Sequence, residues 1–411
     1  MPKRFSAFVI ILLLITLTAL ASGCNKPAAP ALSGDTETDA PADDTADAIT
    51  GEAEGETEAI SEAPAQEMPE TDASATEKPF DNVPSGDKMG EVKTTDKPIN
   101  PLTGLAGTAA QMKSRPAAVM INNIKQACPQ VGISRADVIY EMMAEGGITR
   151  LMMVVSDYAN LGVIGSVRSS REYYVDMAQN HDAIYIHAGG ASTAYDAIQS
   201  RKINNLDGVN MYTPSTFYRD AARASSMGLE HSLMTSGEGI VSGISYKKYR
   251  TTLKDGFSSP LHFVDYNASP IVPTGGEAKH IIIPYNKYTF PQYIYRPSEG
   301  VYSRYQFNGK PHIDGETGEI LTFSNILVLC CKHSYSGDSY GHIGVDTTGS
   351  GDGYFFSQGS YAKIRWSKAS VDEPFVLTCA DGSPLYLNCG KTFINIVDPT
   401  VFANITFNYS H

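Results

Sequence analysis

The chain has 411 residues, of which 42% are hydrophobic and 19% charged, with 36 glycines and 23 prolines. This composition excludes a fibre, a coiled coil and a polytopic membrane protein, and the length predicts two hydrophobic cores. The net charge of -13 is unevenly distributed, because residues 27–77 contain fifteen Asp and Glu and no Lys or Arg. Residues 78–411 carry a net charge of only -1, so we expect no nucleic acid among the partners.

Residues 1–23 have the organisation of an export signal peptide. Lys3 and Arg4 precede an apolar run from Phe8 to Leu20, which is shorter than the roughly 20 residues that span a bilayer. The small residues before Cys24 resemble the lipobox of bacterial lipoproteins. This resemblance implies cleavage before Cys24, attachment of a fatty acid such as palmitate, and anchoring at the extracytoplasmic face of the bacterial cell membrane. A secretory signal followed by an incidental cysteine is the alternative.

Residues 24–97 are mainly Ala, Pro, Thr, Asp and Glu. They include almost no aromatic or β-branched apolar residues, so the segment cannot bury enough surface to offset the loss of chain entropy on folding. We predict a disordered acidic tether, which repulsion between like charges would extend. It serves either as a spacer across a wall layer or as a solubilising segment.

Five further cysteines follow Cys24, and this odd number excludes a complete disulfide framework. Cys379 and Cys389 flank a turn at Asp381-Gly382, but a hairpin centred there would place Cys389 roughly 16 Å beyond the position opposite Cys379. The spacings typical of metal ligands are missing from the sequence. We therefore expect mostly buried thiols, and neither a metal nor a cofactor, at Cys128, Cys330, Cys331, Cys379 and Cys389.

Residues 98–266 alternate between short β-rich runs and helical runs, which predicts an α/β domain. The strand candidates are 117–122, 148–156, 163–168 and 183–187. The helix candidates are 171–179, opened by a capping box at Ser169 and Glu172, 192–201, 214–226 and 235–250.

Residues 277–411 lack the helical period and predict a predominantly β domain, joined to the first by a segment rich in Pro, Gly and Ser. Asn308-Gly309 is typical of a hairpin turn. The remaining strand candidates are 325–331, 354–356, 362–366, 375–379, 385–387 and 392–397.

The first candidate site lies at residues 164–172, where a strand passes into a helix. Arg168 is expected at the strand end and Arg171 in the first helical turn, where unpaired N–H groups point outward. Ligands bind at this edge of open α/β sheets. Two guanidinium groups, two serine hydroxyls and a helix N-terminus would suit phosphate or carboxylate. The alternative is that both arginines pair with a nearby carboxylate such as Glu172 or Asp176.

A second junction of the same design occupies residues 186–192. Gly189 and Gly190 could form an anion-binding turn, and His187 is placed to act as an acid, a base or a donor. Adjacent parallel strands would bring this junction beside the first. Alternatively, the glycines only relax a tight turn that His187 caps.

A third candidate site lies at residues 140–150. In a helix, Glu141 and Glu145 would share a face and could act as a carboxylate pair. In a strand and turn that alignment fails, and salt bridges to Arg135 or Arg150 are the alternative. Asn122, at the end of the first strand, is expected at the same edge of the sheet.

Several segments resemble the YerB-like lipoproteins, a family that pairs an N-terminal and a C-terminal domain of unknown function. The resemblance implies an exported, membrane-anchored protein with two domains and supplies no reaction. Cys128 and Glu230-His231-Ser232 depart from the family pattern. The matching segments are 100–104, 115–123, 145–150, 167–171, 187–190, 308–311 and 387–392.

The order of an Arg-bearing strand end, a helix and a Gly-Gly turn is also similar to the LytR-CpsA-Psr phosphotransferases, which move glycopolymers from polyprenyl pyrophosphate to the cell wall. This similarity implies an envelope phosphotransferase or hydrolase. Its candidate proton carriers are Glu141, Glu145 and His187. The Arg-Asp pair of that family has no counterpart at Arg168-Ser169.

The leading hypothesis is a membrane-anchored lipoprotein whose α/β domain binds an anionic envelope ligand, either a glycan or a phosphate-bearing polymer. The alternatives are the enzyme described above and a scaffold whose β domain engages an envelope protein. The ligand contacts are assigned to Asn122, Arg150, Arg168, Arg171, Gly189 and Gly190.

Overall fold

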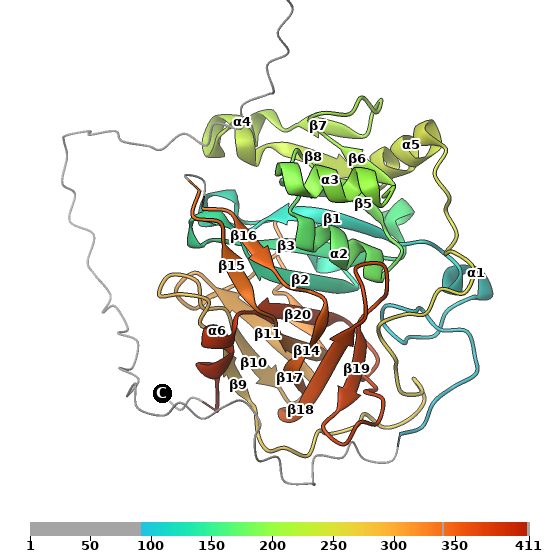
Figure 1. The fold of residues 1–411 in the computed structure, drawn as a ribbon, viewed down its shortest axis with the longest axis vertical. Coiled ribbons are helices and arrows are strands. Elements are labelled where there is room, and N and C mark those ends of the chain that lie inside the picture. Colours follow the sequence, from blue (N-terminus) through green and yellow to red (C-terminus); the bar gives the residue numbers. More distant parts are fainter. Residues whose placement is uncertain (1–91, 339–340, 409–411) are drawn as a thin grey trace, which may run out of the picture. The chain divides into compact units, whose positions relative to one another are not determined.

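The computed structural model describes residues 92–338 and 341–408, which belong to one unit of the chain. The expected signal peptide, Cys24 and nearly all of the expected tether lie outside the described residues. An α/β region is followed by a region of mostly strands, so the expected fold class is confirmed (Figure 1).

A ten-stranded sheet runs through both regions in the order β19-β18-β17-β14-β20-β2-β3-β1-β5-β6 (Figure 1). Its strands from the first region are β1 (Ala117–Asn122), β2 (Val138–Met143), β3 (Thr149–Val155), β5 (Ile184–His187) and β6 (Asn205–Asp207). Its strands from the second region are β14 (Asn325–Cys330), β17 (Gly349–Ser357), β18 (Ser360–Lys368), β19 (Val376–Cys379) and β20 (Thr392–Val397).

The two regions join where β2 pairs in parallel with β20, with Val138 opposite Thr392 and Met142 opposite Ile396. Both strands are buried along their whole length, as expected for apolar runs covered on both faces. The boundaries expected at residues 98–266 and 277–411 stay a prediction, and the structure shows strands from both ranges in one sheet.

Two hydrophobic cores lie on opposite faces of this sheet, because alternate residues of a strand point to opposite sides. Val119 and Ile121 belong to one core, and Ala118 and Met120 belong to the other. Each core includes residues from both regions of the chain, such as Phe393 in the first and Ile394 in the second. The cores are therefore divided by the faces of the sheet and not by the two regions.

Helices cover one face of the α/β region, where α2 (Glu172–Asn180) and α3 (Ser192–Ser200) pack on the second core (Figure 1). The opposite face is covered by a three-stranded sheet and α5, which contribute to the first core. These elements are β4 (Val163–Gly165), β7 (Phe217–Arg219), β8 (Leu233–Ser236) and α5 (Gly237–Lys247).

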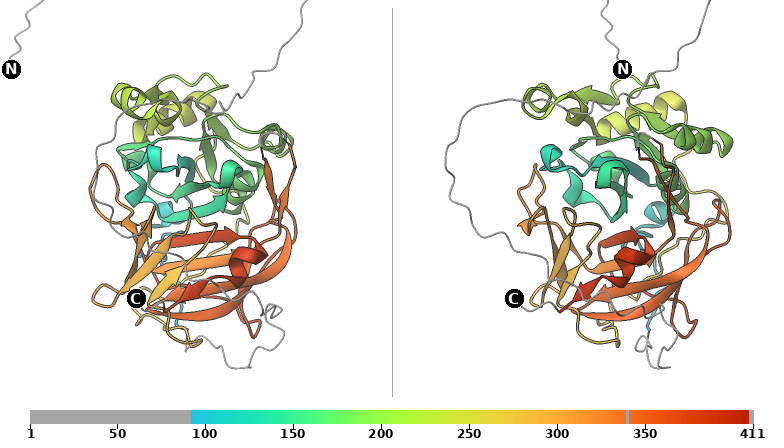
Figure 2. Two further views of the ribbon diagram at one scale, coloured as in Figure 1. Left: turned by 90° about the vertical axis from the view of Figure 1, so that its left-hand side faces the viewer. Right: turned by 60° about the vertical axis from the view of Figure 1, so that its left-hand side comes forward.

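A second sheet packs on the strands of the C-terminal region and supplies Ile281, Tyr293 and Tyr302 to the first core (Figure 2). The hairpin predicted at Asn308-Gly309 is present, but its loop has three residues, 307–309, each with a positive φ, and not the two residues of the type I′ turn that Asn-Gly favours. The strands are β9 (His280–Ile282), β10 (Gln292–Arg296), β11 (Val301–Gln306), β12 (Lys310–Pro311), β13 (Thr322–Phe323) and β21 (Thr406–Phe407). The remaining described elements are β15 (His333–Tyr335), β16 (Ile343–Val345), α1 (Ala109–Met112), α4 (Ala221–Met227) and α6 (Pro399–Ala403).

Several predicted elements are wrong in detail. The helix expected at 214–226 is replaced by β7 and a shorter α4, because the side chain of Asp220 accepts from the Arg223 N–H and caps the helix there. The helix expected at 235–250 begins after β8, with Ser236 as its cap. The capping box at Ser169 is not formed, since α2 starts at Glu172 with Arg171 as N-cap. Residues 385–387 do not form a strand of a sheet, although Leu387 makes an isolated parallel bridge with Phe263.

Among the described residues, no helix combines the length and the apolar character needed to cross a membrane.

Candidate functional site

The two strand-to-helix junctions lie against each other, as the sequence predicts. The Ala188 N–H donates to the Arg168 carbonyl at 3.0 Å, and the Ser170 N–H donates to the Gly189 carbonyl at 2.9 Å. Ser170 and Gly190 form an isolated parallel bridge. The backbone of one junction is thus fastened directly to the other.

Arg168 reaches this position by a route that differs from the prediction. The strand expected at 163–168 ends at Gly165, and β4 pairs antiparallel with β8 outside the ten-stranded sheet. Beyond β4, the Arg168 N–H donates to the Met120 carbonyl of β1 at 3.1 Å. Arg168 therefore lies beside the carboxyl ends of the parallel strands β1 and β5.

Both glycines of the second junction are required by geometry. Gly189 has φ of 70°, in the left-handed region that favours glycine. A Cβ added to Gly190 would lie 3.1 Å from the Cβ of Ser170, so a side chain there would push the two junctions apart. The close contact of the junctions thus depends on Gly190.

Arg150, Arg168 and Arg171, together with Glu145, gather at these junctions, and we call these four residues the arginine cluster. Arg150 lies on β3 opposite Asn122 of β1, and Glu145 opens the 3-10 turn Glu145–Gly147 between β2 and β3. Arg150 Nη2 donates to Glu145 Oε2 at 3.1 Å, and Arg171 Nε donates to Glu145 Oε1. Arg171 is therefore paired with a carboxylate, but not with Glu172 or Asp176, which pair with Arg201.

Backbone carbonyls hold the two inner guanidinium groups in place. Arg150 Nη1 donates to the Ser169 carbonyl at 2.9 Å, and Arg171 Nη1 donates to the Ser170 carbonyl at 2.6 Å. Arg150 Nε is buried and has no hydrogen-bond partner in the described structure. Arg168 is only half-buried, and its Nη1 lies 3.5 Å from the Glu230 carbonyl.

The arginine cluster holds three positive charges and one negative charge. Burial, together with the neighbouring charges of Arg171 and Arg168, lowers the pKa of Arg150 to about 10, although Glu145 acts in the opposite direction. Burial opposes the ionisation of Glu145, but Arg150 and Arg171 outweigh it and hold the pKa of Glu145 below its ordinary value. The cluster therefore keeps an excess of positive charge.

Glu141 does not join Glu145, because their segment is a strand and a turn and not a helix. The Glu141 side chain is fully buried, and its Oε2 accepts from Arg304 Nη2 of β11 at 2.7 Å. Its Oε1 accepts from Thr149 at 2.7 Å and from Asn123 at 3.2 Å. Glu141 is thus half of a buried ion pair between the two regions of the chain.

His187 is also fully buried. Its Nδ1 lies 2.8 Å from the Gly189 carbonyl, its Nε2 lies 3.2 Å from Asn205 Oδ1, and its ring stacks on Tyr185. Both ring nitrogens are therefore engaged within the protein. The arrangement matches the alternative in which His187 supports the glycine turn.

The structure also shows residues that the sequence did not reveal as part of the site. Asp207, at the end of β6, accepts from the backbone N–H of Gly189 at 2.8 Å and from that of Val209 at 2.9 Å. The Tyr195 hydroxyl donates to the same carboxylate at 2.6 Å. The N–H of Gly189 that we expected to face a ligand is thus taken by Asp207.

Asn122 contacts His231, which follows it by more than a hundred residues in the chain. Asn122 Nδ2 lies 3.0 Å from His231 Nδ1, and His231 Nε2 lies 3.2 Å from Glu230 Oε1. Burial lowers the pKa of His231, and so do Arg168 and Arg223, against the opposing effect of Glu230. No local motif links these residues, so sequence patterns could not have found the contact.

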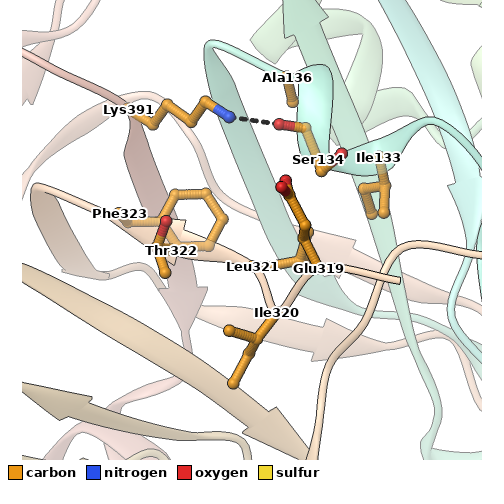
Figure 3. A pocket seen from close by; sticks show the side chains of 9 residues that line it. All are labelled: Ile133, Ser134, Ala136, Glu319, Ile320, Leu321, Thr322, Phe323 and Lys391. Atoms are coloured by element: carbon orange, nitrogen blue, oxygen red, sulfur yellow. Dashed lines mark hydrogen bonds between the residues drawn. The ribbon is translucent and has the colours of Figure 1, made fainter. Parts of the chain in front are cut away.

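A polar pocket lies elsewhere, between Ser134 and Lys391 (Figure 3). The Lys391 ammonium group donates to the Ser134 carbonyl, and the Glu319 side chain points toward the same part of the pocket (Figure 3). The pocket has room for only a few water molecules. Lys391 directly precedes β20.

Of the five cysteines after Cys24, Cys331 and Cys379 are buried, and the other three are half-buried. Across residues 92–338 and 341–408, no group of three or more His, Cys, Asp or Glu is arranged to hold a metal ion.

The chain is similar to proteins of one family. A family model described as "Protein of unknown function (DUF3048) N-terminal domain" matches residues 102–250, and the model for the C-terminal domain matches residues 281–394. The protein named "Putative lipoprotein YerB" of Bacillus subtilis (strain 168) is 29% identical over 316 residues, which cover 76% of this chain and 90% of that protein. The crystal structure of YerB from Bacillus subtilis superposes with a TM-score of 0.64 at 28% identity, covering 75% of this chain and all of that one. The chain therefore belongs to the YerB-like family, in which an N-terminal and a C-terminal DUF3048 domain occur together.

Proposed function

We propose that this protein is a lipoprotein, anchored through Cys24 at the extracytoplasmic face of the bacterial membrane, that binds an anionic envelope ligand at the arginine cluster. The observation that carries the proposal is the excess of positive charge at two adjoining strand-to-helix junctions. The name of the Bacillus subtilis relative supports the lipid anchor.

The ligand group is a phosphate or a carboxylate. Arg168 is the most accessible arginine of the cluster and makes the first contact. The start of α2 has no side-chain cap, so its first N–H groups and the helix dipole add to the attraction for an anion. A guanidinium group donates two parallel hydrogen bonds to either group, which makes the site selective for planar or tetrahedral oxyanions.

Binding is favoured over catalysis because the side chains that would carry a proton already have partners. Glu141 is paired with Arg304, and His187 with Gly189 and Asn205. The pKa of Glu145 is held below its ordinary value by Arg150 and Arg171 against the effect of burial, which makes Glu145 a weak base. A general acid or base must reach the substrate within hydrogen-bond distance, and two of these three side chains are fully buried.

The test is binding of pyrophosphate to the detergent-solubilised full-length protein, measured by isothermal titration calorimetry. A contact between Arg168 and the anion contributes roughly 1.5–3 kcal/mol, so Arg168→Ala should weaken binding about tenfold or more. Arg365→Ala, which removes an exposed arginine of β18, is the matched control and should leave the affinity unchanged. Equal affinities for wild type and Arg168→Ala, or no binding by either, would refute the proposal.

Catalysis is tested separately with a lipid-linked pyrophosphate substrate. If the site only binds, wild type and Arg168→Ala release product at the same background rate. Turnover that depends on Arg168 would establish the enzyme instead.

A further inference from the structure

Glu145 sits in the arginine cluster in the way that a bound anion would. One carboxylate oxygen accepts from Arg150 and the other accepts from Arg171. Among residues 92–338 and 341–408, no other carboxylate forms an ion pair with either arginine. We propose that Glu145 occupies the ligand position as an internal competitor and leaves it when the ligand binds, an inference that rests on the proposed function.

The four charged groups differ in how firmly the fold holds them. Arg150 projects from the central strand β3, and Arg171 is the N-cap of α2 and is held by the Ser170 carbonyl. Glu145 instead stands on a short turn between two strands, and its side chain is partly exposed. The carboxylate is therefore the group that can move while the two arginines stay in place.

Two glycines follow Glu145 and give its turn room to rearrange. Gly146 and Gly147 are exposed, with φ of 66° and 72°. A Cβ added to Gly146 would meet no atom within 4 Å, and one added to Gly147 would meet only Asn286 Nδ2 at 3.5 Å. No side-chain packing therefore presses on Gly146, and hydrogen bonds hold the turn, among them one from the Ala144 N–H to the Ile148 carbonyl at 2.7 Å.

The turn also contacts the C-terminal region. The Gly147 carbonyl accepts from Asn286 Nδ2 at 2.7 Å, and Thr289 Oγ1 lies 3.5 Å from it. Withdrawal of Glu145 moves this carbonyl and breaks the contact with Asn286. Anion binding at the arginine cluster should therefore also change the hydrogen bonding of residues 286–289.

If Glu145 competes with the ligand, removing its charge should raise the affinity for the ligand. Glu145→Gln keeps the size of the side chain and removes its charge, so it weakens the internal contact that the ligand must replace. Pyrophosphate affinity should rise about tenfold in Glu145→Gln, measured by calorimetry on the full-length protein. Glu316→Gln, which removes the partner of Arg135 at another part of the surface, should leave the affinity unchanged.

A lower pyrophosphate affinity in Glu145→Gln than in wild type would overturn the inference. If Glu145 instead orients the arginines for the ligand, Glu145→Gln weakens binding while wild type still binds, and then the proposed function stands and the competitor role fails. If neither protein binds pyrophosphate, both fail together. Thermal unfolding of each variant shows whether a lost affinity comes from lost folding.

Hydrogen exchange gives a second readout that needs no substitution. Saturating pyrophosphate should speed exchange of the amides at residues 144–148 and 286–289 in wild type, because the Gly147 contact opens. Exchange at these positions that is unchanged or slower with pyrophosphate bound would contradict the release of Glu145.

Discussion

The buried ion pair between Glu141 and Arg304 should be one of the most costly places to substitute. Both side chains are fully buried, and Arg304 also donates to Gln306 at 2.7 Å and contacts His312. Burial would lower the pKa of Arg304, but Glu141 outweighs this and holds it above the ordinary value. Each charge is therefore stable in the core only because the other is present.

The size of the effect follows from this mutual dependence. Glu141→Gln keeps the shape of the side chain but leaves the Arg304 charge buried without a counter-ion. Removing one partner of a buried pair costs about 3–5 kcal/mol, whereas replacing both by apolar groups is often close to neutral. We expect Glu141→Gln to lose about 3–5 kcal/mol, and Glu141→Leu with Arg304→Met to lose less than the sum of the two single substitutions.

Urea unfolding measures these differences for wild type, for Glu141→Gln, Glu141→Leu and Arg304→Met, and for the double variant. Fluorescence and circular dichroism are compared to check for a single transition. A loss below about 1 kcal/mol for Glu141→Gln, or additive losses in the double variant, would refute the reasoning. Pyrophosphate binding gives a control, because the pair lies outside the arginine cluster and a folded double variant should still bind.

Three further predictions concern the anchor, acid stability and the junction. Cys24→Ser should abolish palmitate labelling and move the protein from the membrane to the soluble fraction, and retention of the label would contradict the lipid anchor. Burial lowers the pKa of His181 to about 3, so the folded state binds fewer protons than the unfolded state below pH 6.5 and loses stability as the pH falls. Between pH 7 and pH 5 the free energy of unfolding should fall by about 2 kcal/mol because of His181. Urea unfolding of His181→Gln should show a weaker pH dependence than wild type, and the same pH dependence in both proteins would contradict this role of His181. Gly190→Ala should cost about 1–3 kcal/mol and weaken pyrophosphate binding, whereas wild-type affinity in this variant would show that the contact of the junctions is not needed.

Local patterns in the sequence predicted the elements whose signal is local. The apolar run at 117–122 and the run at 392–397 are strands with the expected bounds, and the Gly189-Gly190 turn lies between a strand and a helix. The two junctions lie side by side as expected, but the reason given for it, adjacent parallel strands, is wrong because β4 pairs antiparallel with β8 in another sheet. Helix starts were less accurate, since a cap depends on which neighbouring N–H groups the fold leaves without partners.

Contacts across long stretches of chain could not be predicted. Glu145 pairs with Arg150, five residues away, which the spacing suggested, but its second partner Arg171 comes from another junction. Glu141 finds Arg304 across the two regions, and nothing near Glu141 in the sequence marks it as half of an ion pair. The hydrogen bond from the Gly189 N–H to Asp207 could not be predicted either, because a single aspartate at a strand end belongs to no recognisable sequence pattern.

The place of β20 in the ten-stranded sheet has a consequence for how the chain folds. It lies between β14 and β2, so residues 392–396 must arrive before residues 138–142 have their second neighbour. Parallel pairing over such a separation is slow, because a long loop must close before the contact stabilises it. Until synthesis reaches β20, β2 has an open edge and the ten-stranded sheet cannot be completed. A truncation before residue 392 would leave both β2 and β14 with exposed edges prone to aggregation.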